Sequence, residues 1–290
     1  MKRNIKSYGK SVRMKLANIM NKTGHDYMYL LARYFNERLL YRVGQSRYRD
    51  NFMLKGGSLL YAIDRLDARP TVDVDFLGDK ISRDRNHLHS VFQEILAIEC
   101  VEDGVWFDIE NLRAEPITVE KDYPGTRFFI TAHLDTIVHN LSIDIGFGDI
   151  ITPAAATIDF PLLIPNNPGA SIKAYSLETV LAEKFHTMVD RDVLNSRMKD
   201  FFDCYQILTT KAIDEVILKE AVFATFKNRH LAYNKDLQLF TDAFINDEVR
   251  TKRWQSFLRK IKWQLIPFAD VMNVIKTHFA PILEEYRQIH

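Results

Sequence analysis

The sequence of 290 residues lacks the features of several specialised protein classes. No run of 18 apolar residues occurs, and the longest uncharged run, residues 160–172, contains three prolines, so we expect no membrane span. Cysteine is scarce: Cys100 and Cys204 form no CxxC pair and no zinc spacing, which excludes a disulfide scaffold and favours a reducing, cytoplasmic location. The hydrophobic fraction of 47% and the charged fraction of 27% exclude disorder and collagen.

Motifs of other enzyme classes are missing as well. The sequence has no GxxxxGK followed by Ser or Thr, no GxGxxG, no HExxH and no GxSxG. The nine histidines are scattered, and we interpret His87, His89 and His133 as surface or sheet residues rather than metal ligands. The known nucleotide-loop, zinc-protease and serine-hydrolase patterns are therefore excluded.

Acidic residues are absent from residues 1–25, which hold seven Lys and Arg. Residues 1–55 have a net charge of +10, residues 56–185 of −11 and residues 186–290 of +2. No apolar segment follows the basic start, so it is not a secretory signal, and we expect a basic arm or a first helix. The basic flank either receives a polyanion such as RNA, or is a solvated or partner-binding surface.

Hydrophobic periodicity predicts an α/β (α+β) half followed by a helical half. Expected helices in the first half are 26–42, 59–63 with Ser58 as its cap, and 87–99; expected strands are 71–77 and 141–146. Residues 105–147 alternate as in an antiparallel meander with a turn at 123–126, and residues 150–172 have the composition of a connector. Helices are then expected at 176–190, 199–210, 212–227, 236–245, 249–262 and 268–287.

The acidic centre contains a pattern that predicts phosphate and metal chemistry. Asp73 and Asp75 are two residues apart on an expected strand, so both carboxylates face one side and repel unless a cation neutralises them. Oxygen ligands of this kind suit Mg²⁺ or Mn²⁺. Asp144, between Ile143 and Ile145, would stand on the polar face of its strand as a third acid of a two-metal phosphoryl-transfer site.

A glycine pair precedes the two aspartates. Gly56 and Gly57 would let a phosphate approach the backbone, and the helix N-terminus at Ser58 offers free N–H groups to it. The order of strand, Gly-Gly-Ser, helix and Asp-x-Asp strand resembles the nucleotidyltransferase superfamily that includes DNA polymerase β. The resemblance implies a polymerase β-like mixed sheet with flanking helices, and a helical C-terminal domain after it.

Four sequence blocks carry a narrower resemblance. They are Lys55-Gly-Gly-Ser-Leu59, Arg69-x-Thr-x-Asp-Val-Asp-Phe76, Ser176-Leu-Glu-Thr-Val-Leu-Ala-Glu-Lys-Phe185 and Arg197-x-Lys-Asp-Phe-Phe-Asp203. Together they are similar to the AbiEii/AbiGii toxin family of nucleotidyltransferases over roughly residues 50–210. The resemblance implies a toxin of a bacterial toxin–antitoxin or abortive-infection pair, used in antiviral defence, that transfers a nucleotide from an NTP to an RNA. It also implies tRNA as the acceptor and a cognate antitoxin encoded nearby. We expect residues 1–165 to form the nucleotidyltransferase domain with the N-terminal helices, and residues 166–290 the helical domain.

The resemblance also assigns residues to roles. It makes Lys184 the cation that grips the triphosphate, although a lysine beside Leu177, Val180 and Leu181 could equally pack its stem on the core edge. It makes Asp200 an active-site acid.

Other roles stay open. Arg197, one turn before Asp200, could instead form a structural ion pair with it. The role of Asp203 is also open. For the nucleotide itself, the expected contacts are Lys55 and residues 56–58, in addition to Lys184.

We therefore expect catalytic Asp73, Asp75, Asp144, Lys184 and Asp200, with the first three as metal ligands. Three alternatives remain at this point: a protein acceptor for the nucleotide, a nucleotide sensor without catalysis, and an interaction protein whose carboxylates pair only with arginines.

Overall fold

The computed structural model describes residues 2–117, 125–231 and 236–289, with side chains from residue 8 onward in these ranges. The chain folds into two compact units, each described by itself. The first comprises residues 1–148 and 156–174, and the second residues 149–155 and 175–290. The predicted fold class, a mixed sheet with flanking helices followed by a helical part, is confirmed. The predicted domain boundary at 165/166 stays a prediction.

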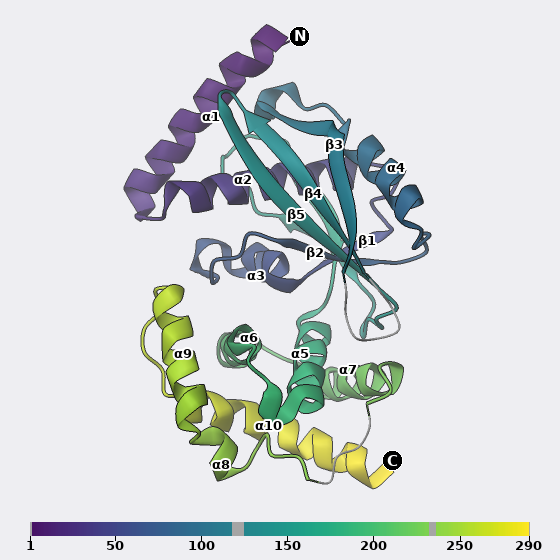
Figure 1. Ribbon diagram of the computed structural model, residues 1–290, viewed down its shortest axis with the longest axis vertical. Helices are drawn as coiled ribbons and strands as arrows, with labels where there is room; N and C mark the ends of the chain where they lie inside the picture. Colours follow the sequence, from purple (N-terminus) through teal and green to yellow (C-terminus); the bar gives the residue numbers. More distant parts are fainter. Residues whose placement is uncertain (1, 118–124, 232–235, 290) are drawn as a thin grey trace. The chain divides into compact units, whose positions relative to one another are not determined.

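A seven-stranded mixed sheet forms the centre of the first unit, in the order β3-β4-β5-β2-β1-β7-β6 (Figure 1). The strands are β1 (Phe52–Lys55), β2 (Val74–Gly78), β3 (Val105–Ile117), β4 (Gly125–Leu134), β5 (Ile137–Phe147), β6 (Ala156–Phe160) and β7 (Ala170–Ala174). The predicted antiparallel meander is confirmed as β3-β4-β5, while β2 runs antiparallel to β1 and parallel to β5. The turn predicted at 123–126 lies partly outside the described residues.

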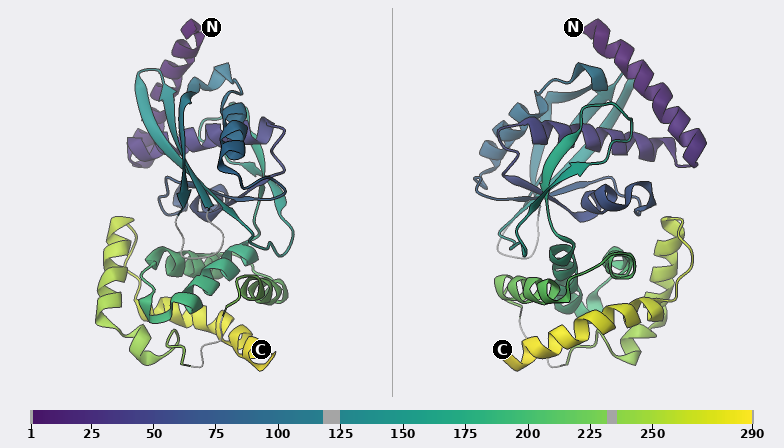
Figure 2. Two further views of the ribbon diagram at one scale, coloured as in Figure 1. Left: turned by 45° about the vertical axis from the view of Figure 1, so that its right-hand side comes forward. Right: turned by 180° about the vertical axis from the view of Figure 1, so that it is seen from behind.

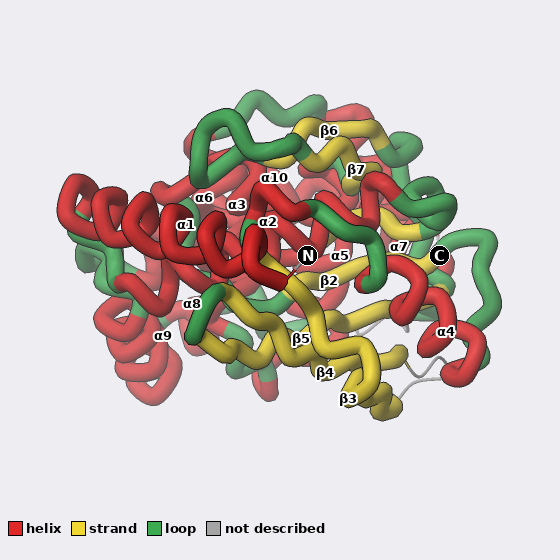
Figure 3. The backbone as a smooth tube through the Cα atoms, turned by 90° about the horizontal axis from the view of Figure 1, so that it is seen from above, coloured by secondary structure: helices red, strands yellow, loops and turns green. Residues whose placement is uncertain are grey.

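Helices α2 (Tyr27–Gln45) and α4 (Arg85–Leu96) cover one face of this sheet. Phe92 of α4 stacks on Phe128 of β4 with ring centroids 4.7 Å apart, and Phe35 of α2 stacks on His139 of β5 at 5.4 Å. The unit also contains α1 (Lys2–Thr23), α3 (Gly56–Asp64) and the short 3-10 turns η1 (Arg65–Asp67) and η2 (Val101–Asp103). Figure 3 shows α1 and α2 on one side of β3, β4 and β5, and Figure 2 (right) shows the sheet from that side. The apolar residues of the alternating strands face α2 and α4.

Helix α2 is buried along most of its length, including its polar residues. The buried polar side chains are Arg33, Asn36, Glu37, Arg38 and Arg42. An unpaired buried charge costs roughly several kcal/mol of folding stability. Each of these side chains therefore needs hydrogen-bond or ion-pair partners inside the protein. These partners come from three segments that are distant in sequence.

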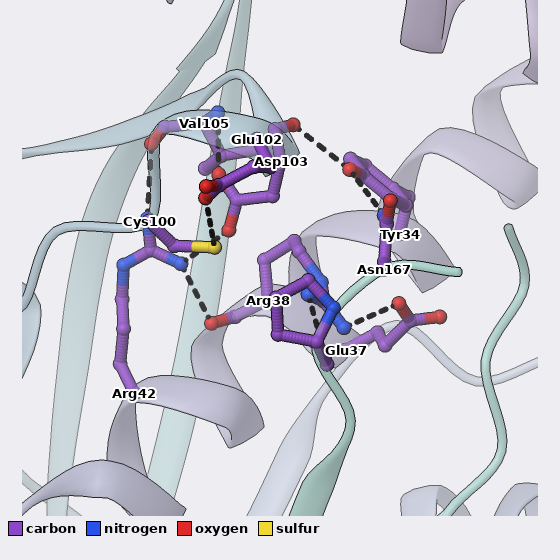
Figure 4. Close-up of polar contacts among 10 residues, drawn as sticks. Tyr34, Glu37, Arg38, Arg42, Cys100, Glu102, Asp103, Val105 and Asn167 are labelled. Atoms are coloured by element: carbon purple, nitrogen blue, oxygen red, sulfur yellow. Dashed lines mark hydrogen bonds and ion pairs between the residues drawn. The ribbon is translucent and has the colours of Figure 1, made fainter. Parts of the chain in front are cut away.

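Figure 4 shows one of these networks. Arg42 donates to an Asp103 carboxylate oxygen at 2.8 Å and to the Val105 carbonyl at 3.0 Å, which fixes the segment that enters β3. Arg38 donates to Glu37 at 2.6 Å and to the Pro168 carbonyl at 2.9 Å, which fixes the segment before β7. Helix α2 thus anchors the entry to the edge strand β3 and the entry to β7.

In the first unit, the following details differ from the expectations, in addition to α4, which spans Arg85–Leu96 in place of 87–99. Helix α3 begins at Gly56 rather than at a Ser58 cap, and strand β2 begins at Val74, three residues later than expected. The segment 150–172 is not a bare connector, because it contains β6 and the start of β7. Strand β7 pairs in parallel with β1 through Leu54 and Ala174, a long-range contact that local composition does not report.

The second unit is built from helices around an aromatic core. They are α5 (Leu177–Arg191), η3 (Asp192–Leu194), α6 (Met198–Thr210), α7 (Glu215–Asn228), α8 (Asp242–Ile245), α9 (Glu248–Lys260) and α10 (Phe268–Ile289). Phe185 stacks on Phe279 at 4.1 Å, and Trp254 is fully buried. The expected helix 236–245 is shorter, because only α8 forms there. Among the described helices, none is both long and apolar enough to cross a bilayer.

The buried Glu37 predicts a pH-dependent stability. Burial raises the pKa of Glu37 from 4.5 to about 7, although the Arg38 charge and the Leu163 N–H lower it. As pH rises, Glu37 loses its proton in the unfolded chain at a lower pH than in the folded protein. Its contribution to the free energy of unfolding is therefore complete below pH 4.5 and is lost as pH rises towards 7. The loss is on the order of 3 kcal/mol. We expect Glu37→Gln to flatten this slope in urea unfolding experiments across that window.

Glu94→Gln is the matched control, because Glu94 pairs with Arg47 at 2.8 Å on the surface, where both side chains are at least half exposed. It should leave the pH slope of the wild type unchanged. A Glu37→Gln variant with the wild-type slope would contradict the assignment.

Candidate active site

A row of charged residues crosses the sheet at one level. The strand register places Lys55 opposite Asp75, Asp75 beside Asp144, and Asp144 opposite Arg127. Directly paired residues point to the same face, so all four side chains share the face opposite α2 and α4. The two central carboxylates are therefore neighbours, flanked by a cation on each side.

Asp73 joins this row from the residue before β2. Its carboxylate accepts a hydrogen bond from the Ser142 hydroxyl of β5 at 2.7 Å, which puts it on the same face as Asp144 two residues further along β5. Its backbone carbonyl accepts from the Ser58 hydroxyl of α3 at 2.8 Å. Ser58 is fully buried, so its side chain holds the entry to β2 and does not cap α3.

The two glycines permit close packing around Asp75 and Thr71. Gly56 has φ +65°, and a Cβ there would lie 2.1 Å from a carboxylate oxygen of Asp75. A Cβ on Gly57 would lie 2.7 Å from the Thr71 hydroxyl oxygen. Glycine is thus required where the start of α3 passes over the β2 carboxylate.

Helix α2 supports the site from behind. Arg33 donates to the Thr71 carbonyl, and Asn36 donates to the Val72 carbonyl at 2.9 Å. Thr71 and Val72, whose carbonyls accept these hydrogen bonds, directly precede Asp73. Burial lowers the pKa of Arg33, while the neighbouring Tyr29, Tyr61 and Asp73 oppose that shift. The backbone that carries the first aspartate is therefore fixed by buried side chains of α2.

Arg127 holds Asp144 with two bonds. Its Nε and Nη2 each donate to one carboxylate oxygen at 2.6 Å, the two-pronged geometry of a strong arginine–carboxylate pair. These hydrogen bonds raise the pKa of Arg127, burial opposes this, and the charges of Asp144, Asp73 and Asp75 raise it further. Arg127 thus responds to the carboxylates of Asp73, Asp75 and Asp144 together.

The donor set fits a hard divalent cation in its chemistry, because carboxylates occupy adjacent positions on one sheet face. Within residues 2–117, 125–231 and 236–289, however, no three His, Cys, Asp or Glu side chains are gathered closely enough to hold a metal ion. Arg127 engages both oxygens of Asp144, and Ser142 engages one oxygen of Asp73. Asp73 and Asp75, two residues apart and on the same face, could hold such a cation.

The second unit contains a separate buried charge cluster. The Lys184 ammonium donates to Asp200 at 2.9 Å and to Asp203 at 2.6 Å, and Arg197 donates to Asp200 at 2.5 Å. The Lys184 side chain is only 11% exposed. Burial alone would raise the pKa of Asp200, but the Lys184 and Arg197 charges lower it below its ordinary value. The cluster joins α5 to α6.

The expected site residues therefore fall into two groups. The first unit brings together Asp73, Asp75 and Asp144 with Lys55 and residues 56–58 at the start of α3. The second unit joins Lys184, Asp200, Asp203 and Arg197. The ion pair considered for Arg197 and Asp200 is present, and the Lys184 head contacts two carboxylates. Sequence reasoning missed Arg127 and Ser142. Alternation along their strands would have placed them on a polar face, but not beside these aspartates.

A mixed sheet with neighbouring carboxylates beside a helix that begins at Gly-Gly-Ser is the arrangement of a nucleotidyltransferase fold. The family model for the AbiEii nucleotidyl transferase toxin, from type IV toxin–antitoxin systems, matches residues 38–274. The chain belongs to this family.

Two crystal structures are similar to the chain. One, of a candidate nucleotidyltransferase from H. pylori, has a TM-score of 0.51 at 14% identity and covers 92% of this chain and 99% of its own. The other, of JHP933 from Helicobacter pylori, has a TM-score of 0.48 at 13% identity and covers 88% of this chain and 94% of its own. No curated protein matches the sequence. The first similarity shows a shared fold.

The Gly56 contact generates a prediction. Gly56→Ala should cost about 1–2 kcal/mol of folding stability through its left-handed backbone, and its methyl group should push the Asp75 carboxylate out of place. Gly24→Ala is the matched control, because Gly24 has φ +73° but no atom within 4 Å of an added Cβ. Urea unfolding should show the backbone loss in both variants and a larger total loss for Gly56→Ala, while calorimetry should show lost Mg²⁺–NTP binding only for Gly56→Ala. Equal nucleotide affinities in the two variants would contradict the role of this contact.

Proposed function

We propose that this toxin-family chain transfers a nucleotide from an NTP to an RNA, with tRNA as the acceptor and with release of pyrophosphate. The observation that carries the proposal is the row of Asp75 and Asp144 on adjacent strands, with Asp73 bonded into the same face and the Gly56–Gly57 start of α3 packed against Asp75. Phosphoryl transfer needs mainly positioning and neutralisation of charge, and this face supplies fixed carboxylates for both.

The residues of the first unit take the following roles. Asp73 and Asp75 would hold Mg²⁺ or Mn²⁺, which supplies charge neutralisation to the triphosphate when bound. The N–H groups at the start of α3, in Gly57 and Ser58, would receive the β- and γ-phosphates, and Lys55 would add a cation beside Asp75. Asp144 would complete the metal site or orient the attacking hydroxyl of the acceptor.

The residues of the second unit take roles from the family resemblance. Lys184 would neutralise the triphosphate, with its ammonium oriented by Asp200 and Asp203. Asp200 would be the active-site aspartate of this unit. Lys184 and Arg197 keep its side chain ionised, so it would act as a carboxylate. The family also supports a cognate antitoxin as a protein partner. The activity would form part of an abortive-infection defence.

The carboxylate pair provides the test of the proposed function. Asp73→Asn and Asp75→Asn should each lower nucleotide transfer at least 100-fold, roughly, because a neutral amide cannot replace a negative metal ligand. The assay incubates the protein with each labelled NTP, Mg²⁺ and total bacterial RNA, and follows label in RNA and in protein. Asp79→Asn, just beyond the end of β2, is the control and should retain activity. Wild-type transfer rates in either site variant would refute the metal assignment, and label appearing in protein alone would refute the RNA acceptor.

Lys184 generates a second prediction. Lys184→Ala should weaken NTP binding more than RNA binding, because its charge is assigned to the triphosphate. It should also destabilise the second unit by about 3 kcal/mol, since Asp200 and Asp203 lose the cation that they share. Lys219→Ala is the control, because Lys219 pairs with Glu285 at 3.1 Å on the surface. Calorimetry with a non-hydrolysable NTP measures the effect, and a folded Lys184→Ala variant with unchanged NTP affinity would leave Lys184 a packing role only.

A further inference from the structure

The half-exposed face of β3, β4 and β5 continues well beyond the carboxylates. Along β4 the residues on this face are Arg127, Phe129, Thr131 and His133, while the alternating residues are buried against the helices. Figure 1 shows β3, β4 and β5 in front of α2, so that this face looks toward the viewer. The carboxylate row lies at the Arg127 end of this face.

Aromatic rings lie on this face in place of the usual small polar residues. Trp106 of β3 is 46% exposed and stacks on His133, with ring centroids 3.7 Å apart and planes within 2° of each other. Closer to the carboxylates, the Arg113 guanidinium lies over the ring of the half-exposed Phe129, 5.2 Å from its centroid. Burial lowers the pKa of His133, which disfavours a charge on the Trp106 stack, although Asp108 opposes this shift. Two flat, accessible surfaces therefore follow one another along the sheet.

Basic helix α1 lies on the same side of the sheet as α2 and reaches the turn at the far end of this face (Figure 3). Arg13 donates to Asp135 at 2.8 Å and to Thr136 at 3.0 Å, both in the turn between β4 and β5. Gly9 packs so closely on Gly104 that a Cβ on Gly104 would lie 2.6 Å from the Gly9 nitrogen. The α1 side chains of Lys10, Lys15 and Lys22 are exposed. The side chains of Lys2, Arg3 and Lys6, which the charge count includes, lie outside the described ones.

We propose that this face, termed the stacking face (Trp106, Arg113, Phe129 and His133), binds the unpaired end of the acceptor RNA strand. The proposal rests on the nucleotidyl transfer proposed above and specifies where the acceptor lies. Bases stack on exposed aromatic rings and arginine planes at about 1–3 kcal/mol per base, and this requires single strands. From His133 to Arg127, the strand runs six residues, about 20 Å, which suits a short row of bases that ends beside Asp144.

The stacking face lies among both acidic and basic side chains. We therefore expect it to bind RNA by stacking on the bases rather than by pairing with the phosphates. Asp108 and Glu115 stand on the same strand as Trp106 and Arg113, so the face itself is not strongly basic. Among the exposed lysines of α1, Lys10 lies one turn from Arg13 and would receive the strand's backbone at this end, whereas Lys15 and Lys22 line a hollow with residues 164–166. A duplex offers no base faces, so we expect it to bind more weakly than a single strand.

The test compares single-stranded with duplex RNA. A fluorescein-labelled oligouridylate of about eight nucleotides, alone or annealed to its complement, is titrated with the full-length protein and followed by anisotropy. Trp106→Ala and Phe129→Ala should each weaken single-strand binding about five-fold or more, and Trp106→Phe should retain most of it. Tyr48→Ala is the matched control. The half-exposed Tyr48 ring also lies under a guanidinium, with the Arg47 Cζ 4.9 Å from its centroid, but its hydroxyl donates to Glu94 of α4, on the helix side of the sheet. It should bind as the wild type does.

Each outcome separates this proposal from the proposed function. Loss of oligonucleotide binding in the two alanine variants, with NTP affinity unchanged, supports the stacking face even if no transfer activity is found. Wild-type affinity in both folded variants, or equal affinity for duplex and single strand, overturns it even if RNA is labelled. Labelling of a protein acceptor without oligonucleotide binding overturns it as well.

Discussion

Burial of the polar face of α2 is the constraint on which the first unit depends. A buried arginine or glutamate is stable only if other groups replace its water, and these groups must stay in place. Arg33 and Asn36 bind the carbonyls of Thr71 and Val72, while Arg42 binds Asp103 and the start of β3. One helix therefore orders segments that are far apart in sequence, and one of these segments delivers the first aspartate to the sheet.

The second constraint is the register of β2 between β1 and β5. With β2 antiparallel to one neighbour and parallel to the other, Asp75 lies between Lys55 and Asp144, and Arg127 follows on β4. A shift by one residue would turn the aspartates into the apolar layer beneath α2 and α4, at a large cost in desolvation. Packing and chemistry therefore require the same register. The two flanking cations limit the repulsion between neighbouring carboxylates.

The sequence predicts those parts of the fold and site whose cause is local. Helix α2, the helices of the second unit and the alternating strands follow from periodicity. The Gly-Gly-Ser and Asp-x-Asp blocks indicate the nucleotidyltransferase superfamily, and together with the two later blocks they indicate the family. The cap predicted at Ser58 is wrong, because a helix cap and a buried hydrogen bond to Asp73 look alike in sequence. Strands β6 and β7 escape prediction because β7 pairs with β1, about 120 positions earlier in the chain. The Arg127–Asp144 pair and the partners of Lys184 likewise depend on register and helix packing, which spacing alone does not determine.

The central proposal is that Asp73 and Asp75 form the metal–nucleotide site. It is tested most directly by Mn²⁺ binding, measured by electron paramagnetic resonance with a non-hydrolysable NTP present. The wild type should bind Mn²⁺ with the nucleotide, and a combined Asp73→Asn, Asp75→Asn variant that stays folded should lose this binding, because the amides provide no negative oxygen ligands. Equal Mn²⁺ binding by the wild type and the double variant would contradict the proposal.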